Sequence, residues 1–164
     1  MEMDALYREV ILDHHRHPHG GEPLPDPETE AAGKNPSCGD EVTLQLRWDG
    51  DRIADVAVLT EGCAISRASG SILADLVRGR TREQARRLAE AFRRVMHEPD
   101  GELPDDLEPG DLEVLTGVRQ FPARVKCALL PWITLLEALL AAEQDRAPAA
   151  VSTEETTDGE ADRG

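Results

Sequence analysis

The chain has 164 residues, which suits one domain with its own core; 40% of them are apolar and only 3% aromatic. The formal net charge of −15 argues against a nucleic-acid partner, because binding to phosphates requires a basic surface. The N-terminal residues lack a secretory pattern, and no apolar run approaches the length of a membrane span. Three cysteines, an odd number, favour free thiols or a metal over disulfides, so we expect a cytoplasmic protein.

Residues 3–16 have the apolar spacing of an amphipathic helix, which we expect to end before Pro18. A loop rich in Gly and Pro should then run to Pro36. The end of this helix is rich in histidine, at His14, His15, His17 and His19. A metal site is one interpretation of these histidines. Pro18 interrupts the turn between His15 and His19, so the pattern favours a polar helix end whose cations suit the helix dipole.

Residues 41–48 alternate between apolar and polar side chains, which predicts a strand. The pair Asp49-Gly50 is a strong hairpin turn signal, and a second strand follows at 53–59. Cys38 lies just before the first of these strands and Cys63 just after the second, so an antiparallel hairpin places them side by side. The topology therefore predicts that Cys38, Asp40 and Cys63 can share a site.

A helical pattern returns at residues 65–77, where small side chains would let the helix lie close to the sheet; they are Ser66, Ser69, Gly70 and Ser71. A capping box that begins at Thr81 predicts a helix over about 82–97. After an acidic connector over 99–110, Asp111 should cap a short turn that ends at Leu115.

The last helix should start between Pro122 and Ala128 and continue to about Glu143, with a kink or restart at Pro131. The sequence thus predicts an α+β domain over residues 1–144. In it a small antiparallel sheet of about three strands packs against an N-terminal helix and several C-terminal helices. The acidic composition of residues 145–164 predicts a disordered tail.

Cys63 and Cys127 both lie near predicted helix starts, where unpaired backbone N–H groups favour the thiolate form. Three thiols and the Asp40 carboxylate would complete a tetrahedral metal site. The alternative is that each cysteine is a small buried apolar side chain. Cys38 fits that alternative least, because the loop around it is polar. Arg124 lies one helical turn before Cys127, where it either steadies negative charge or is a plain surface residue.

Several segments, in register over about residues 4–140, resemble the IscU/SufU (NifU N-terminal-like) family of iron–sulfur cluster assembly proteins. They are Leu6-Tyr7-Arg8, Asn35-Pro36-Ser37-Cys38-Gly39-Asp40, Glu61-Gly62-Cys63-Ala64-Ile65-Ser66 and Phe121-Pro122-Ala123-Arg124-Val125-Lys126-Cys127. Lys126 stands where the scaffold branch of the family has a histidine, and the acidic connector between the second and third cysteines is long. Both features resemble the SufU branch.

The resemblance implies a zinc ion held by four ligands, which are Cys38, Asp40, Cys63 and Cys127. It implies a partner, a SufS-type cysteine desulfurase, and possible transfer onward to scaffold proteins of the same system. Cys38 would accept the sulfur as the ligand that leaves the metal, while Gly39 lets its loop move and Arg124 and Lys126 support the site. The resemblance therefore implies a zinc-dependent sulfurtransferase that works as the partner of a desulfurase rather than as a stand-alone enzyme.

Two other functions fit the same residues. One is a scaffold on which iron, or a transient [2Fe-2S] cluster, is bound by the same cysteines. The other is a small protein in which zinc only supports folding and no chemistry takes place.

Overall fold

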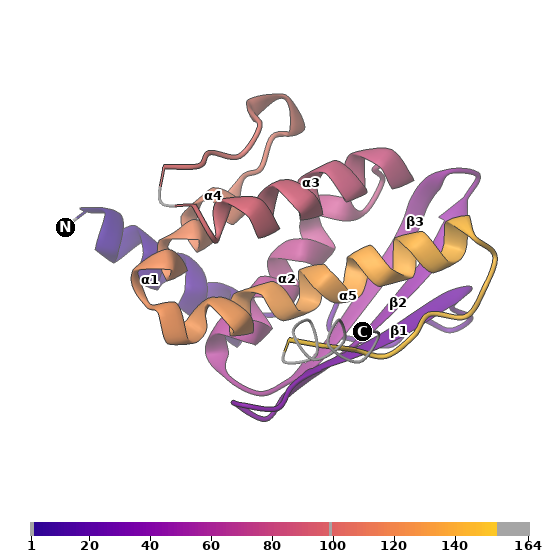
Figure 1. The fold of residues 1–164 in the computed structure, drawn as a ribbon, viewed down its shortest axis with the longest axis horizontal. Coiled ribbons are helices and arrows are strands. Elements are labelled where there is room, and N and C mark those ends of the chain that lie inside the picture. The colour runs from indigo at the N-terminus through magenta and orange to yellow at the C-terminus, as the bar shows by residue number, and fades with distance from the viewer. Residues whose placement is uncertain (1, 99, 154–164) are drawn as a thin grey trace, which may run out of the picture.

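The computed structural model describes residues 2–98 and 100–153. Its elements are α1 (Glu2–Arg16), β1 (Thr29–Asn35), β2 (Asp40–Asp49), β3 (Arg52–Glu61), α2 (Ala64–Val77), α3 (Arg82–Val95), η1 (Asp105–Leu107), α4 (Asp111–Leu115), η2 (Thr116–Gln120), η3 (Pro122–Arg124), α5 (Val125–Glu143) and β4 (Val151–Ser152). Helices α2 and α5 pack on one face of the sheet, α1 packs on α2, and α3 packs on α5 (Figure 1).

The sheet has the strand order β3-β2-β1-β4, and β2 is antiparallel to both of its neighbours. The α+β class, the hairpin between β2 and β3 and the capping box of α3 are confirmed. The strand count differs from the expected three, because the two-residue strand β4 pairs in parallel with β1 and makes the sheet mixed.

Strand β1 occupies residues that we expected to be loop. Its inward positions hold Ala31, Gly33 and Asn35, none of which is the β-branched or aromatic residue typical of strands. At Gly33 the packing requires a residue without a side chain, because a Cβ added there would lie 2.3 Å from Oγ1 of Thr134 on α5. Close approach of α5 therefore overrides the weak strand propensity of this segment.

Helix α5 is the centre of the core. Its Trp132 is fully buried and lies against Phe92 of α3, with ring centroids 5.6 Å apart. Contrary to expectation, residues 122–143 are long and apolar enough to cross a membrane by length and composition alone, with an 18-residue window of mean hydropathy 1.7. Since 61% of that window is buried inside the fold, the apolar character of α5 is explained by its place in the core.

The expected restart at Pro131 is wrong, because α5 runs as one helix from Val125 to Glu143. Proline lacks the N–H that would bond the carbonyl of Cys127 four residues earlier. The hydroxyl of Ser66 on α2 lies 3.1 Å from that carbonyl, and the hydroxyl of Ser69 donates to the carbonyl of Ala128 at 2.6 Å. The carbonyl that Pro131 leaves without its helical donor therefore faces a polar side chain of α2.

Asp111 does not cap α4 as expected, since no side-chain cap bond forms there. Its carboxylate instead accepts a hydrogen bond at 2.9 Å from Nε2 of His14, near the end of α1. The residue at the helix start is therefore used for a long-range contact between α4 and α1.

Residues 145–153, for which composition predicted disorder, follow a defined path along the sheet edge (Figure 1). Arg146 pairs with Glu137 at 2.7 Å, and the N–H of Thr153 donates to the carbonyl of Lys34 at 3.1 Å. The rest of the expected tail, residues 154–164, lies outside the described residues. The domain boundary at 144 stays a prediction.

We expect Gly33→Ala to destabilise the protein by about 1–3 kcal/mol, because the added methyl group overpacks the contact between β1 and α5. Ala32→Val is the matched control, since Ala32 directly precedes Gly33 in β1 and is exposed on the other face. Chemical denaturation of both variants measures the difference. Equal stability of the two variants would contradict the close packing described here.

Candidate metal centre

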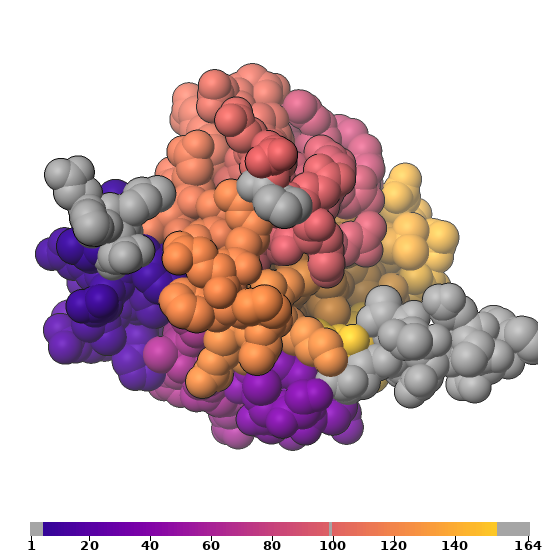
Figure 2. Space-filling model, turned by 60° about the vertical axis from the view of Figure 1, so that its left-hand side comes forward, coloured from indigo at the N-terminus to yellow at the C-terminus, as the bar shows by residue number. Residues whose placement is uncertain are grey.

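Three segments that are distant in sequence meet at one end of the molecule: the turn between β1 and β2, the junction of β3 with α2, and the start of α5. Figure 2 turns this end toward the viewer, and the orange segment leading into α5 lies beside the violet and magenta segments. Each segment carries one cysteine. Cys38 is exposed, Cys63 is half-buried and Cys127 is buried.

Local structure fixes each cysteine differently. Cys38 lies in a tight turn, in which its own N–H and that of Gly39 both donate to the carbonyl of Asn35, at 3.2 and 2.8 Å. Gly39 has a φ of +77°, in the left-handed region that favours glycine. Cys63 is the N-cap of α2, with its Sγ 3.4 Å from the N–H of Ser66, and Cys127 belongs to the first turn of α5.

Three of the four predicted ligands form one cluster, and the fourth, Cys63, lies beside it. One donor atom from each of Cys38, Asp40 and Cys127 lies within 4.8 Å of the others. The sulfurs of Cys38 and Cys127 are 3.6 Å apart. Cys63 adjoins this group, with its sulfur 3.7 Å from Oδ2 of Asp40. The hairpin argument thus placed Cys63 well, and the packing of α5 brings in Cys127.

Asp40 is only 1% exposed, and two groups at the start of α2 hold its carboxylate. The N–H of Cys63 donates to Oδ1 at 2.9 Å, and the hydroxyl of Ser66 donates to Oδ2 at 2.8 Å. Gly62 makes room for this arrangement, because a Cβ at that position would lie 2.0 Å from Oδ1. Protein groups alone therefore define the orientation of the carboxylate.

The electrostatics of the site favour a bound cation. Burial raises the pKa of the Cys127 thiol, and the negative charge of Cys63 and a hydrogen bond with Asp40 raise the pKa further. A cation would offset this crowding of groups that become anionic. Three soft sulfurs and one carboxylate oxygen are a donor set that fits tetrahedral zinc, and thiolates also hold iron–sulfur clusters.

Arg124 lies beside the sulfurs although its own side chain is exposed. A hydrogen bond to Cys127 raises the pKa of its guanidinium, and the negative charge of Cys63 adds to the effect. Of the two interpretations offered by the sequence, this position favours a residue that steadies negative charge. Lys126, the other predicted supporting residue, is exposed on the first turn of α5.

Asn35 and Ser66 are site residues that the sequence did not identify. Asn35 is fully buried, and its side-chain amide lies 3.7 Å from the sulfur of Cys127 while its Oδ1 accepts a hydrogen bond from Thr153. Ser66 bridges Asp40 and the carbonyl of Cys127. An inward-facing amide in a strand is a recognisable signal, but β1 had not been predicted.

A family model described as the NifU-like N-terminal domain matches residues 6–128, which include all four candidate ligands. The chain belongs to the NifU-like N-terminal domain family. This agrees with the resemblance of the sequence motifs, and it makes the chain a member of an iron–sulfur cluster assembly family.

Two relatives of different description are about equally similar. The zinc-dependent sulfurtransferase SufU of Bacillus subtilis is 39% identical over 133 residues, which cover 81% of this chain and 88% of that protein. The iron–sulfur cluster assembly scaffold protein IscU of Streptococcus pyogenes is 38% identical over 138 residues, covering 84% of this chain and 85% of that protein. Overall identity therefore does not separate the two roles.

Solved structures share the fold. A crystal structure described as a SUF-system scaffold protein of Fervidobacterium islandicum has a TM-score of 0.74 and 36% identity, covering 80% of this chain and 94% of that one. The N-terminal part of a NifU-like protein of Brucella abortus has a TM-score of 0.77 and 25% identity, covering 88% and 99%.

We expect Gly62→Ala to lower the zinc affinity about 10–100-fold, because the methyl group displaces the carboxylate of Asp40. Competition with a chromophoric chelator measures the affinity. Gly79→Ala is the matched control, since Gly79 also has a positive φ but no atom lies near its added Cβ. Equal affinities of the two variants would show that Gly62 does not position Asp40.

Proposed function

We propose that this protein accepts sulfur from the persulfide of a SufS-type cysteine desulfurase during iron–sulfur cluster assembly, and that zinc is bound by Cys38, Asp40, Cys63 and Cys127. The observation that carries the proposal is the convergence of three thiols and a buried carboxylate, with one thiol exposed in a turn. Similarity to a protein named as a zinc-dependent sulfurtransferase supports it.

Zinc, when bound, is redox-inert and keeps its cysteine ligands in the thiolate form. The protein's contribution is to hold three ligands firmly and one loosely. Cys63 caps α2, Cys127 is buried on α5, and Asp40 is held by two hydrogen bonds. Cys38 is the exposed member, in a turn that contains Gly39. Cys38 is therefore the ligand best placed to leave and act as the acceptor.

The transfer conserves oxidation state overall. The Cys38 thiolate attacks the terminal sulfur of the desulfurase persulfide, a new S–S bond forms on Cys38, and the S–S bond of the donor breaks. The desulfurase cysteine leaves as a thiolate, so no outside oxidant or reductant is needed. The resemblance to the family implies that a histidine of the desulfurase takes the metal position that Cys38 gives up.

Residues next to the thiols suit a reaction in which the sulfur of Cys38 changes its charge and position. The guanidinium of Arg124 lies close to the sulfurs and stabilises negative charge on them. The side-chain amide of Asn35 points at the sulfur of Cys127. Cys127 therefore keeps this hydrogen-bond donor when Cys38 has left the metal. Both residues would hold the remaining ligands in place during transfer.

Cluster scaffolding is the second candidate, because a protein named as an IscU scaffold is 38% identical to this chain. The same thiolates could hold a [2Fe-2S] cluster. Lys126 favours transfer over scaffolding, since the resemblance places a histidine at this position in the scaffold branch.

We expect Cys38→Ala to abolish both acceptance of persulfide sulfur and stimulation of the desulfurase, while the fold remains intact. The rate of sulfide or alanine production is measured with and without the protein, and transferred sulfur is detected by mass spectrometry. Ser37→Ala, one residue away in the same exposed turn, is the control and should keep activity. Full sulfur acceptance by Cys38→Ala would refute the assignment.

Metal analysis distinguishes the two candidate roles. Protein purified without air should contain about one colourless zinc per chain, as expected for one closed tetrahedral site. Cluster formation is measured in parallel, as the visible spectrum of the protein after incubation with iron, a sulfide source and a reductant. A stable coloured cluster at high occupancy, together with no effect on desulfurase rate, would favour scaffolding instead.

A further inference from the structure

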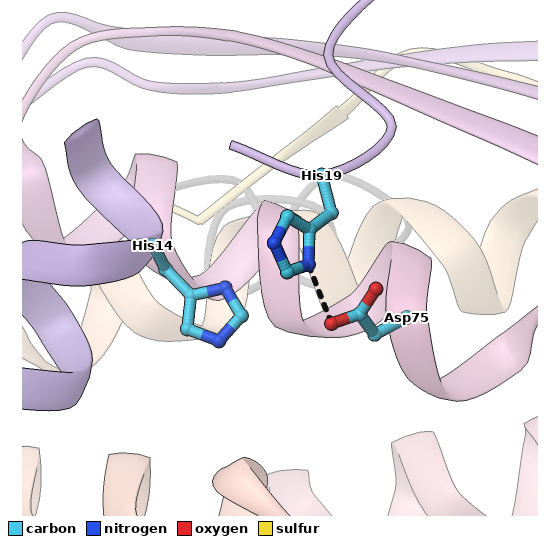
Figure 3. Close-up of side chains that lie close together, drawn as sticks. All are labelled: His14, His19 and Asp75. Carbon is cyan, nitrogen blue, oxygen red and sulfur yellow. Dashed lines mark hydrogen bonds and ion pairs between the residues drawn. The ribbon is translucent and has the colours of Figure 1, made fainter. Parts of the chain in front are cut away.

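A second cluster of side chains that could hold a metal ion lies where the end of α1 and the loop after it meet α2. His14 at the end of α1, His19 in the following loop and Asp75 on α2 each offer a donor atom, all within 4.8 Å of one another (Figure 3). Asp75 follows Cys63 by twelve residues, which corresponds to about 18 Å along the helix. This cluster is therefore separate from the thiol site.

Hydrogen bonds orient the ring of His14. Its Nε2 lies 2.9 Å from the carboxylate of Asp111, and its Nδ1 lies 2.7 Å from the hydroxyl of Ser71. That hydroxyl also accepts a hydrogen bond from the backbone N–H of His19 at 2.8 Å. The tautomer that satisfies this network has a proton on Nε2, donated to Asp111, and an unprotonated Nδ1. Nδ1 is then the nitrogen with a lone pair to offer.

A histidine whose second ring nitrogen donates to a carboxylate is the usual arrangement around protein metal ions. His14 is 3% exposed and has one defined ring orientation. The side chains of His19 and Asp75 are 44% and 43% exposed, and they already contact each other at 2.6 Å between Nδ1 and Oδ2. The cluster thus combines one fixed, buried donor with two donors that solvent, and an ion, can reach.

We propose that His14, His19 and Asp75 form a second metal site, which binds a divalent first-row transition metal ion such as Zn²⁺, with water in the remaining positions. Two imidazoles and a carboxylate suit such ions, whereas Ca²⁺ and Mg²⁺ prefer sites made of oxygen alone. Binding exchanges the hydrogen bond from Ser71 to His14 for a metal bond. The ring of His19 binds through one nitrogen and carries its proton on the other, so the proton moves from Nδ1 to Nε2 if Nδ1 is the ligand.

In the sequence alone, the histidine pattern favoured a polar helix end over a metal site, because Pro18 separates His15 from His19. The structure selects His14 instead of His15 and adds a carboxylate from a helix more than fifty residues away in the sequence. His17 is exposed near Asp13 and is not a member of the cluster. That makes His17 a useful control.

The test uses the full-length protein with its thiol site already filled by one zinc per chain, handled without air. Titration with Co²⁺ should show one additional equivalent bound, with the weak visible bands of nitrogen and oxygen ligands. Strong thiolate-to-cobalt absorption with release of an equal amount of zinc, and no net gain of metal, would mean that cobalt binds only among the cysteines. A lack of any cobalt binding would mean that no second site exists. Either result would overturn the proposal.

Variants locate the ion. His19→Ala and Asp75→Asn should each weaken cobalt binding at least about tenfold, and Asp111→Asn, which acts through the orientation of His14, about tenfold. His17→Ala should leave the affinity unchanged. Binding that is insensitive to His19→Ala, or equally lowered by His17→Ala, would refute the assignment. The desulfurase is not part of this experiment, so its outcome is independent of the proposed sulfur-transfer function.

Discussion

The contact between the Asp40 carboxylate and the start of α2 is the constraint on which the candidate metal centre depends. A carboxylate that is 1% exposed is costly unless it is hydrogen-bonded or paired with a cation. Here the N–H of Cys63 and the hydroxyl of Ser66 satisfy it, at the end of the helix where the dipole favours negative charge. This contact ties β2 to α2, so the cysteines at the two ends of the hairpin are held together without a disulfide. Gly62 is required because any side chain there would occupy the space of the carboxylate.

Short-range patterns predicted much of the site. The alternation of residues 41–48 and the Asp49-Gly50 turn fixed which chain ends are neighbours, and that was enough to group Cys38, Asp40 and Cys63. Cys127 could not be placed in the same way, because its position depends on how α5 packs against β1 and α2. Only the resemblance to a family supplied it beforehand. Local sequence therefore determines the hairpin, whereas tertiary packing determines the position of Cys127, the fourth candidate ligand.

The wrong predictions for β1 and for Pro131 have a common cause. The inward positions of β1 hold Ala31, Gly33 and Asn35, which lack the usual strand signal, and at Gly33 α5 lies too close for any side chain. A kink or restart was expected at Pro131, but the lost hydrogen bond concerns the carbonyl of Cys127, which faces a serine of the neighbouring helix. In both cases a rule about one segment was overruled by a group from another segment, and such compensation cannot be read from local composition.

The serines of α2 show how one helix can serve several neighbours. Their small size lets α2 lie close to the sheet, where a Cβ on Gly70 would come within 2.8 Å of Val58. Close packing also buries polar groups, and each of these must find a partner. Ser66 faces Asp40 and α5, Ser69 bonds the carbonyl of Ala128, and Ser71 links His14 with the backbone of His19. The same hydroxyls that satisfy the buried groups also orient the donors of both clusters. Packing distance and ligand geometry are thus set by one stretch of sequence, and neither can change without the other.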